Sequence, residues 1–283
     1  MKYYSPKTLE ETVNIIDEYK ETAALVAGCT EVLNRNDFFN NKKAIINTTE
    51  IQEIKQIEDL GYKIRIGAGV TFSEILNSKI IQDYNLALFN AVKVFGSTQI
   101  RNRATIAGNI ANASPAADSL PPLIISNATL SLMSTQGKRE IKLKDLIYAP
   151  GKTTLKPHEI ITFIEFEKDK PQEIIFFRKI GTRKALSIAK ASVAFKANCS
   201  SEKLSNVNIA YGSVGPTVII SKNAKKVLEK NVFNINTVEH ASIAAFEEVS
   251  PITDIRSTAS YRKIIIKNIL IEELSRFCKE KPL

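Results

Sequence analysis

A stretch of small and polar residues from Thr105 to Asp118 has a composition that suits neither an ordinary core nor an ordinary surface. Gly108 and its alanine neighbours would let the main chain approach a bound group closely. Short hydroxyl and amide side chains for hydrogen bonding come from Thr105, Asn109, Asn112 and Ser114. A diphosphate would suit the first half, and a ribose hydroxyl would suit the carboxylate of Asp118. The stretch predicts a ligand-binding loop, with a small-residue surface loop as the alternative.

A second stretch of this kind lies upstream, where an apolar strand breaks at Gly28 and continues through Thr30 into a helix-like segment. It consists of Leu25, Val26, Ala27, Gly28, Cys29, Thr30, Glu31 and Val32. Backbone N–H groups at such a turn can bind phosphate oxygens without a basic side chain. Neither stretch matches the GxGxxG or GxxxxGK[ST] pattern, so a dinucleotide held here requires a scaffold other than a Rossmann or P-loop fold.

The composition is that of a globular protein. With 283 residues, 44% of them hydrophobic, the chain can form two domains or one large one. No apolar stretch approaches the roughly 20 residues of a membrane span, and the start of the chain lacks the hydrophobic segment of a signal peptide. We therefore expect a cytoplasmic protein that does not bind a membrane.

The charged residues, cysteines and histidines offer little chemistry of their own. The net charge is +9, but Lys and Arg are scattered without interleaved aromatics, which favours a solvated basic surface over nucleic-acid binding. Such a surface would attract anionic small molecules or an acidic partner. Cys29, Cys199 and Cys278 form no CxxC pair, so we expect no disulfide framework, metal site or iron–sulfur site in this chain. His158 and His240 are not near a Ser or Cys nucleophile, and no catalytic side chain is predicted.

The elements that would position the two loops alternate between strands and helices, which indicates an α+β fold. A helix is expected to begin at Ser5-Pro6 and to end near Tyr19. A capping box over 71–74 predicts the start of another helix. Strands are expected at 23–27, 43–47, 63–67, 127–133 and 160–167, and further helices at 86–95 and 120–125.

A polar, proline-bearing segment, 168–172, is the predicted joint between a larger N-terminal and a smaller C-terminal domain. Beyond it, strands at 173–179, 188–197 and 205–211 come first, and helices at 221–229, 237–249 and 257–279 follow. This order predicts a sheet with helices on one face. Cys278 lies on the apolar face of the last helix, so it is expected to pack in the core rather than to react.

Together, these segments resemble the FAD-binding subunits of the molybdenum hydroxylases, most closely those of bacterial xanthine dehydrogenases. The typical Ala-Gly-Gly-Thr-Asp loop of that family corresponds to Ala-Gly-Cys-Thr-Glu at 27–31. The other matching segments are 99–102, 105–109, 113–118, 151–155, 159–161, 178–184, 254–256 and 261–262. The resemblance covers nearly the whole chain, in order and at the family's spacing.

The resemblance implies a two-part flavin fold of the vanillyl-alcohol oxidase and p-cresol methylhydroxylase type over residues 1–168, with subdomains of about 1–55 and 56–168. A smaller α/β domain like that of CO dehydrogenase flavoproteins would occupy 172–283. The backbone of Val26 to Val32 would hold the FAD diphosphate together with Ala104, Thr105, Ile106, Ala107, Gly108 and Asn109. Ser114 and Asp118 would hold the ribityl or adenosine part, and Leu25 and Asn112 complete the predicted binding set.

The resemblance also implies which residues face the isoalloxazine ring. Phe95 and Ile160 or Ile161 would line it. Lys179 would place a positive charge near N1 and the C2 oxygen, where an ammonium favours the anionic form of the reduced flavin. The alternative for Lys179 is a solvated lysine at a strand edge.

The implied function is electron transfer through FAD. Electrons would come from [2Fe–2S] clusters of a small partner subunit, which receives them from a large molybdopterin-binding subunit, and the flavin would pass them to NAD. In this view the molybdopterin subunit chooses the substrate: xanthine, hypoxanthine, nicotinate or another heterocycle. The alternatives are a flavin-free assembly subunit and a flavoenzyme like the enolpyruvyl-UDP-N-acetylglucosamine reductase of cell-wall synthesis.

Two positions depart from the family's glycines. Cys29 replaces the second glycine of the first loop, and Ala107 replaces the first glycine of the Gly-Gly pair in the second. A positive φ at either position would cost on the order of 1 kcal/mol. We expect ordinary backbone angles at both, and we expect Cys29 to be a small apolar residue rather than a redox centre.

Overall fold

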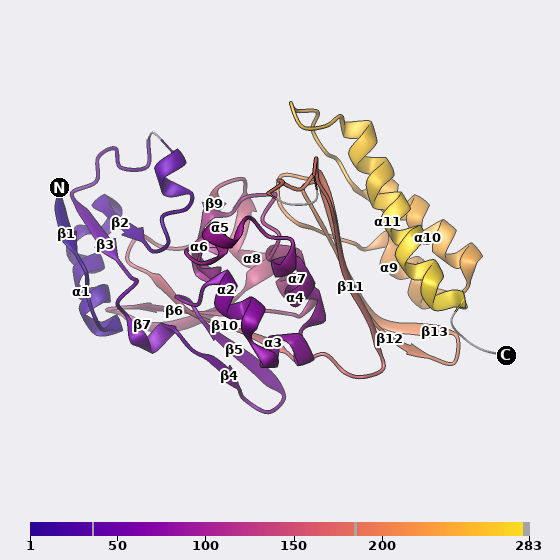
Figure 1. Ribbon diagram of the computed structural model, residues 1–283, viewed down its shortest axis with the longest axis horizontal. Helices are drawn as coiled ribbons and strands as arrows, with labels where there is room; N and C mark the ends of the chain where they lie inside the picture. The colour runs from indigo at the N-terminus through magenta and orange to yellow at the C-terminus, as the bar shows by residue number, and fades with distance from the viewer. Residues whose placement is uncertain (36, 184–185, 280–283) are drawn as a thin grey trace. The chain divides into compact units, whose positions relative to one another are not determined.

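The computed structural model describes residues 1–35, 37–183 and 186–279, and the chain forms two compact units (Figure 1). Unit 1 consists of Met1–Gln82, Gly96–Ala113 and Asn127–Lys168. Unit 2 consists of Asp83–Phe95, Ser114–Ser126 and Asp169–Leu283, of which the last four residues lie outside the described part. Two short segments from the first half of the chain thus belong to the same unit as the C-terminal part.

A small parallel sheet and a helix begin unit 1. The strands β1 (Lys2–Tyr4), β2 (Ala23–Val26) and β3 (Ala44–Asn47) pair in the order β1-β3-β2. Helix α1 (Leu9–Tyr19) ends where the sequence predicts. Its predicted start at Ser5-Pro6 is wrong, because the hydroxyl of Thr8 accepts the Glu11 N–H at 3.1 Å and caps the helix at Leu9.

A five-stranded antiparallel sheet forms the rest of the unit 1 framework, in the order β4-β5-β10-β6-β7. Its strands are β4 (Ile57–Asp59), β5 (Lys63–Gly67), β6 (Thr129–Ser134), β7 (Gly137–Lys142) and β10 (Ile160–Glu167). The predicted strands at 63–67 and 160–167 are confirmed. The sequence does not predict β7, since its mostly polar and exposed residues show no apolar alternation.

Short elements lie between the strands of these two sheets along the chain. They are η1 (Lys20–Thr22), η2 (Val32–Asn34), η3 (Gln52–Ile54), α2 (Phe72–Asn77), α3 (Lys79–Tyr84), α5 (Thr98–Arg101), α6 (Ile106–Asn112), α8 (Leu143–Leu146), β8 (Ile147–Ala149) and β9 (Lys152–Thr153). The predicted capping box of α2 is confirmed, with the carboxylate of Glu74 accepting the Thr71 N–H at 2.7 Å. Val13 and Ile16 of α1 pack with Ile46 and Ile160, so α1 joins the two sheets through a shared apolar cluster.

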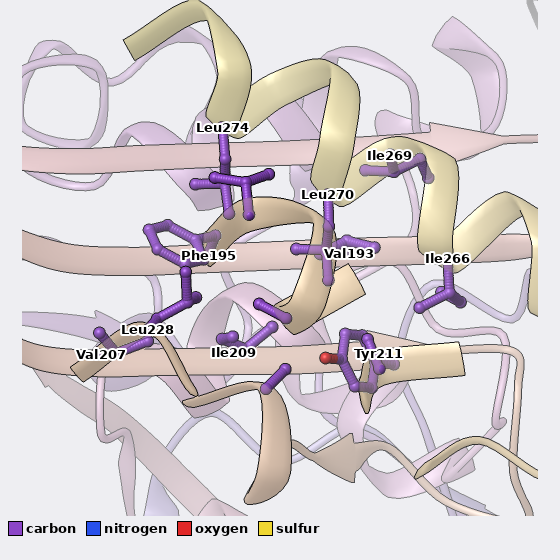
Figure 2. Packing of buried hydrophobic residues seen from close by; sticks show 14 of the residues in the cluster. Val193, Phe195, Val207, Ile209, Tyr211, Leu228, Ile266, Ile269, Leu270 and Leu274 are labelled. Atoms are coloured by element: carbon purple, nitrogen blue, oxygen red, sulfur yellow. The ribbon is translucent and has the colours of Figure 1, made fainter. Parts of the chain in front are cut away.

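The framework of unit 2 is an antiparallel sheet with three helices on one face. The strands β11 (Glu173–Ile180), β12 (Ala191–Ser200), β13 (Lys203–Gly212) and β14 (Ile219–Ile220) pair in chain order. The helices are α9 (Asn223–Lys230), α10 (Ile235–Glu248) and α11 (Ala259–Lys279). Figure 2 shows Phe195 and Tyr211 of the sheet packed beneath Ile266, Leu270 and Leu274 of α11. Cys278 packs at the margin of this core, as expected.

Two further helices cover the opposite face of that sheet. They are α4 (Leu86–Lys93) and α7 (Leu120–Ile125). Phe177, Ala194 and Ala210 are cross-strand neighbours, and all three pack against these helices. The predicted sheet with helices on one face is confirmed by α9, α10 and α11, and the structure adds a second covered face that the sequence did not predict. Both faces of the strands are apolar, and the second face is covered by segments that precede the sheet by more than 45 residues in the chain.

Among the described residues, no helix is long and apolar enough to cross a membrane.

Candidate functional site

The first predicted loop leaves the end of β2 and offers unused backbone donors. β2 ends at Val26, and a 3₁₀ turn begins at Val32. Between them, the N–H groups from Ala27 to Val32 donate no hydrogen bond to any described residue. Runs of consecutive N–H groups near a left-handed residue form concave anion sites. This loop therefore has the donors that a phosphate group requires.

Cys29 is the left-handed residue of that loop, with φ of +58°. The expectation of an ordinary backbone angle is thus wrong at Cys29, where a side chain occupies a conformation that favours glycine. The expectation is confirmed at Ala107, which lies inside α6 and has no positive φ. The conformation at Cys29 costs about 1–2 kcal/mol, and its thiol donates a hydrogen bond to the Ala27 carbonyl at 3.4 Å.

Gly28 brings the two predicted loops together. A Cβ at this position would lie 1.8 Å from the carbonyl oxygen of Arg103 and 2.4 Å from its carbonyl carbon. The side chain of Arg103 reaches back, with Nε donating to the Gly28 carbonyl at 3.4 Å. Glycine is needed here because main chain packs directly on main chain. The sequence does not single out Arg103, although it immediately precedes the second loop.

The second loop begins helix α6, and its own fold uses its backbone donors. The hydroxyl of Thr105 accepts the Gly108 N–H at 3.2 Å, and the Thr105 carbonyl accepts that of Asn109 at 3.0 Å. The N–H groups of Ile106 and Ala107 donate to the Val70 and Ala68 carbonyls at 3.0 and 3.3 Å. This segment can therefore contribute its small side chains, its hydroxyl and its close-packed surface to a ligand, while free amides come from the first loop.

In unit 2 the structure pairs Asp118 with Lys179. Nζ of Lys179 lies 2.5 Å from Oδ2 of Asp118, and the two side chains are only 5% and 6% exposed. The same ammonium donates to the carbonyl of Val94 at 3.3 Å, at the C-terminal end of α4, where the helix dipole favours a cation. The alternative that Lys179 is a solvated lysine is thereby excluded.

The carboxylate of Asp118 retains one unused oxygen. Oδ1 is buried and accepts no hydrogen bond from any described residue. Burial raises the pKa of Asp118 to about 6, against the opposing attraction of Lys179. An unsatisfied buried carboxylate oxygen costs free energy, so a ligand hydroxyl that donated to it would stabilise the site.

The remaining predicted residues lie in both units. Phe95 is half-buried in unit 2, directly after α4, and the hydroxyl of Ser114 accepts the Ala116 N–H at 3.2 Å. Ile160 packs in the core of unit 1, and Ile161 is also buried. Of the matching segment 178–184, Lys184 lies outside the described residues.

Unit 2 also contains a buried ionic cluster that is not among the residues predicted from the sequence. Nζ of Lys196 lies 3.0 Å from Oδ1 of Asp169 and 3.2 Å from Oε2 of Glu173, and all three side chains are buried. The other oxygen of Asp169 accepts the N–H of Leu86, the first residue of α4, at 2.7 Å. The available signal was a lysine within the apolar run of β12, since a buried lysine needs a partner.

Among the described residues, unit 1 offers the free amides of the first loop, and unit 2 offers the orphaned oxygen of Asp118. Groups of these two kinds are typical of proteins that bind a phosphate- and hydroxyl-bearing cofactor. Residues 1–168 match the family model described as the FAD binding domain in molybdopterin dehydrogenase. Residues 176–276 match the CO dehydrogenase flavoprotein C-terminal domain. The chain belongs to the FAD subunits of the molybdenum hydroxylase family, with a two-part FAD-binding domain and a C-terminal flavoprotein domain, which confirms the resemblance and the predicted fold class.

Individual relatives match this chain over nearly its full length. A xanthine dehydrogenase FAD-binding subunit of Escherichia coli O157:H7 is 28% identical over 278 residues, which cover 96% of this chain and 94% of that protein. A nicotinate dehydrogenase FAD-subunit of Eubacterium barkeri is 26% identical over 292 residues, 99% of each chain. In the structure of a Hydrogenophaga pseudoflava carbon monoxide dehydrogenase that lacks the Mo-pyranopterin moiety, one chain matches with a TM-score of 0.92 and 25% identity, over 97% of this chain and 96% of that one.

Proposed function

We propose that this chain holds FAD and passes electrons from [2Fe–2S] clusters of a partner subunit to NAD, within a cytoplasmic complex like xanthine dehydrogenase. The observation that supports this most is the run of free N–H groups from Ala27 to Val32, next to the close contact of Gly28 with Arg103. FAD has a diphosphate to accept these donors and ribityl hydroxyls to donate to Asp118.

The partners proposed are a large molybdopterin-binding subunit and a small [2Fe–2S] subunit. The names of the relatives support a multi-chain enzyme, since they include FAD-binding subunits, medium chains and a medium subunit. The xanthine dehydrogenase relative supports an N-heterocyclic substrate such as a purine.

The residues of this chain would bind and orient the cofactor and tune its charge. The amides of Ala27 to Val32 would hold the diphosphate, and the Asp118 carboxylate would accept a hydrogen bond from a hydroxyl. Lys179, held by Asp118 and the Val94 carbonyl, would carry the positive charge beside the ring. Phe95 and Ile160 or Ile161 would line the ring and exclude water. FAD itself supplies the transfer of electrons between one-electron and two-electron partners.

Flavin retention tests the cofactor part of the proposal. The purified chain should be yellow with stoichiometric flavin, and Gly28→Ala should lower its flavin affinity at least about tenfold, because the new Cβ would separate the two loops. Gly61→Ala is the matched control, since its Cβ would meet no atom within 4 Å although its φ is +88°. A wild-type chain that binds no flavin would instead indicate an assembly subunit.

Reduction by nicotinamide cofactors tests the electron route. NADH alone should bleach the flavin absorbance of the wild-type chain. Bleaching that required NADPH and was reversed only by an enolpyruvyl sugar nucleotide would favour the cell-wall reductase.

A further inference from the structure

The turn Asp254–Ser257, part of a segment that the family resemblance singles out, is held by many hydrogen bonds. Asp254 and Ser257 exchange backbone hydrogen bonds of 3.1 and 3.3 Å. Oδ1 of Asp254 also accepts the N–H groups of Arg256 and Ser257, at 2.9 and 3.1 Å. The Arg256 amide is the largest reason why the pKa of Asp254 falls to about 2, and Arg262 lowers it further, so the carboxylate stays ionised.

Arg262 of α11 anchors this turn to the sheet of unit 2. Its Nη2 donates to Asp254 Oδ1 at 2.6 Å, and its Nη1 donates to the carbonyls of Lys190 and Ser213 at 3.2 and 2.9 Å. Only 4% of Arg262 is exposed. The turn is therefore fixed to the ends of β12 and β13 and cannot move independently of them.

At the tip of this fixed turn stands an apolar side chain without a role in the core. Ile255 is 100% exposed, and Ile252 just before the turn is 72% exposed. Tyr261 and Ile264, on the first turns of α11, are 45% and 46% exposed. A single exposed isoleucine is ordinary. Ile255 on a preorganised turn, with Ile252 just before it and two more large apolar side chains nearby in the chain, can be buried by a partner at little cost in conformational entropy.

The charges around the turn indicate the kind of partner. From Pro251 to Asn268 the basic residues are Arg256, Arg262, Lys263 and Lys267, and the acidic one is Asp254, which already binds both arginines. Nζ of Lys190 lies 5.0 Å from the ring centre of Tyr261 and adds to the positive surface. A second copy of this chain, with net charge +9, would be repelled.

We propose that Ile255 is the central anchor of a docking surface for another subunit of the complex, which presents an apolar socket with an acidic rim. This inference rests on the proposed function, since it takes its partner from the proposed complex. Asp254 and Arg262 are positioning residues, because they hold the turn through which Ile255 is presented.

The test uses the tagged chain isolated from its native host with whatever complex it forms. Ile255→Asp should lose iron and molybdopterin from the isolated material, and Ile255→Ala should weaken assembly about tenfold, the effect of a hot-spot residue. Ile243→Asp, at an isoleucine 45% exposed on α10, is the control and should retain the complex. Flavin content and melting temperature of the isolated chain should be the same in both Ile255 variants as in the wild type, because the Ile255 side chain is fully exposed.

Each other outcome overturns the inference in a recognisable way. If Ile255→Asp retains iron and molybdopterin, the docking surface lies elsewhere and the proposed function stands. If the wild-type chain carries neither, the proposed function fails and the inference with it. If light scattering showed dimerisation that depends on Ile255, the partner of this surface would be a second copy of this chain and not another subunit. If the chain bound phosphatidylglycerol vesicles through Ile255, the partner of this surface would be a lipid membrane and not another subunit.

Discussion

At the residue scale, two side chains stand where the family resemblance leads one to expect glycine, and their backbone conformations differ. Cys29 has φ of +58°, whereas Ala107 lies within helix α6. Glycine removes the strain of a left-handed backbone conformation, but it destabilises a helix. The two departures should therefore have opposite effects on stability.

Cys29→Gly should raise the free energy of unfolding by about 1 kcal/mol, because it removes left-handed strain at a small cost in unfolded-state entropy. Ala107→Gly should lower it by about 0.5–1 kcal/mol through the lower helix propensity of glycine. Urea denaturation of the two variants measures both changes. Equal effects in the same direction would contradict this assignment of backbone angles.

A second prediction at this scale concerns the pH dependence caused by Asp118. The folded pKa of about 6 lies above that of the unfolded chain, so the folded state binds this proton more tightly. Proton binding by Asp118 therefore stabilises the folded state fully at low pH, and this stabilisation is lost as the pH rises through about 6. Between about pH 4 and 7.5, the free energy of unfolding of the wild type should therefore fall by about 2–3 kcal/mol relative to that of Asp118→Asn.

Chemical denaturation of flavin-free protein at several pH values measures this difference. Lys179→Met serves as the companion variant, because without the ammonium the ionised Asp118 is buried alone. In this variant the free energy of unfolding should fall more between low and high pH than it does in the wild type. A difference between wild type and Asp118→Asn that does not change with pH would contradict the prediction.

At the element scale, helix α4 is bound at both ends by buried charged side chains of unit 2, Asp169 at its start and Lys179 at its end. Asp169, paired with Lys196, accepts the N–H of Leu86 at the start of the helix. Lys179 donates to the Val94 carbonyl at its end. Asn85 caps the helix by accepting the Leu88 N–H at 3.0 Å. The position of Phe95, which follows α4, thus depends on these two hydrogen bonds from charged side chains.

Lys196→Met should destabilise the protein by about 3 kcal/mol, because it leaves Asp169 and Glu173 buried without a cation. Lys225→Met is the matched control: its partner Glu229, a half-buried neighbour on α9, keeps the Val207 N–H as a hydrogen-bond donor, so about 0.5 kcal/mol or less is expected. Thermal and urea denaturation measure stability, and hydrogen exchange should show faster exchange in α4 for Lys196→Met. Equal effects of the two substitutions would contradict the structural role of the cluster.

At the scale of the whole molecule, the order of the chain does not follow the two compact units. The family models divide the matched chain at residues 168 and 176, whereas unit 2 also includes α4 and α7 from the first half. Phe177, Ala194 and Ala210 are buried by these helices. The C-terminal sheet therefore needs both earlier segments to complete its core.

A fragment that begins at Asp169 should fail to fold as a stable monomer. It would expose the face carrying Phe177, and leaving one phenylalanine in water costs about 2–3 kcal/mol. Size-exclusion chromatography and the dispersion of amide NMR signals measure the outcome, with the intact chain as the control. Cooperative unfolding of a monomeric fragment would show that α4 and α7 are dispensable for this sheet.

Sequence patterns by themselves determined the local elements of this protein and the family to which it belongs. Strands β5 and β10, helix α7 and the capping box at Thr71 follow from alternation, helix spacing and side-chain capping, which act over a few neighbouring residues. The two ligand loops are likewise visible as runs of small and polar residues.

Only the tertiary structure decided which of these segments meet. Gly28 contacts Arg103 across 75 positions, and Asp118 pairs with Lys179 across 61. Helices α4 and α7 cover a sheet that follows them in the chain. The physical reason is that such pairings depend on close packing and on the burial of charges between distant segments, for which short-range patterns carry no information.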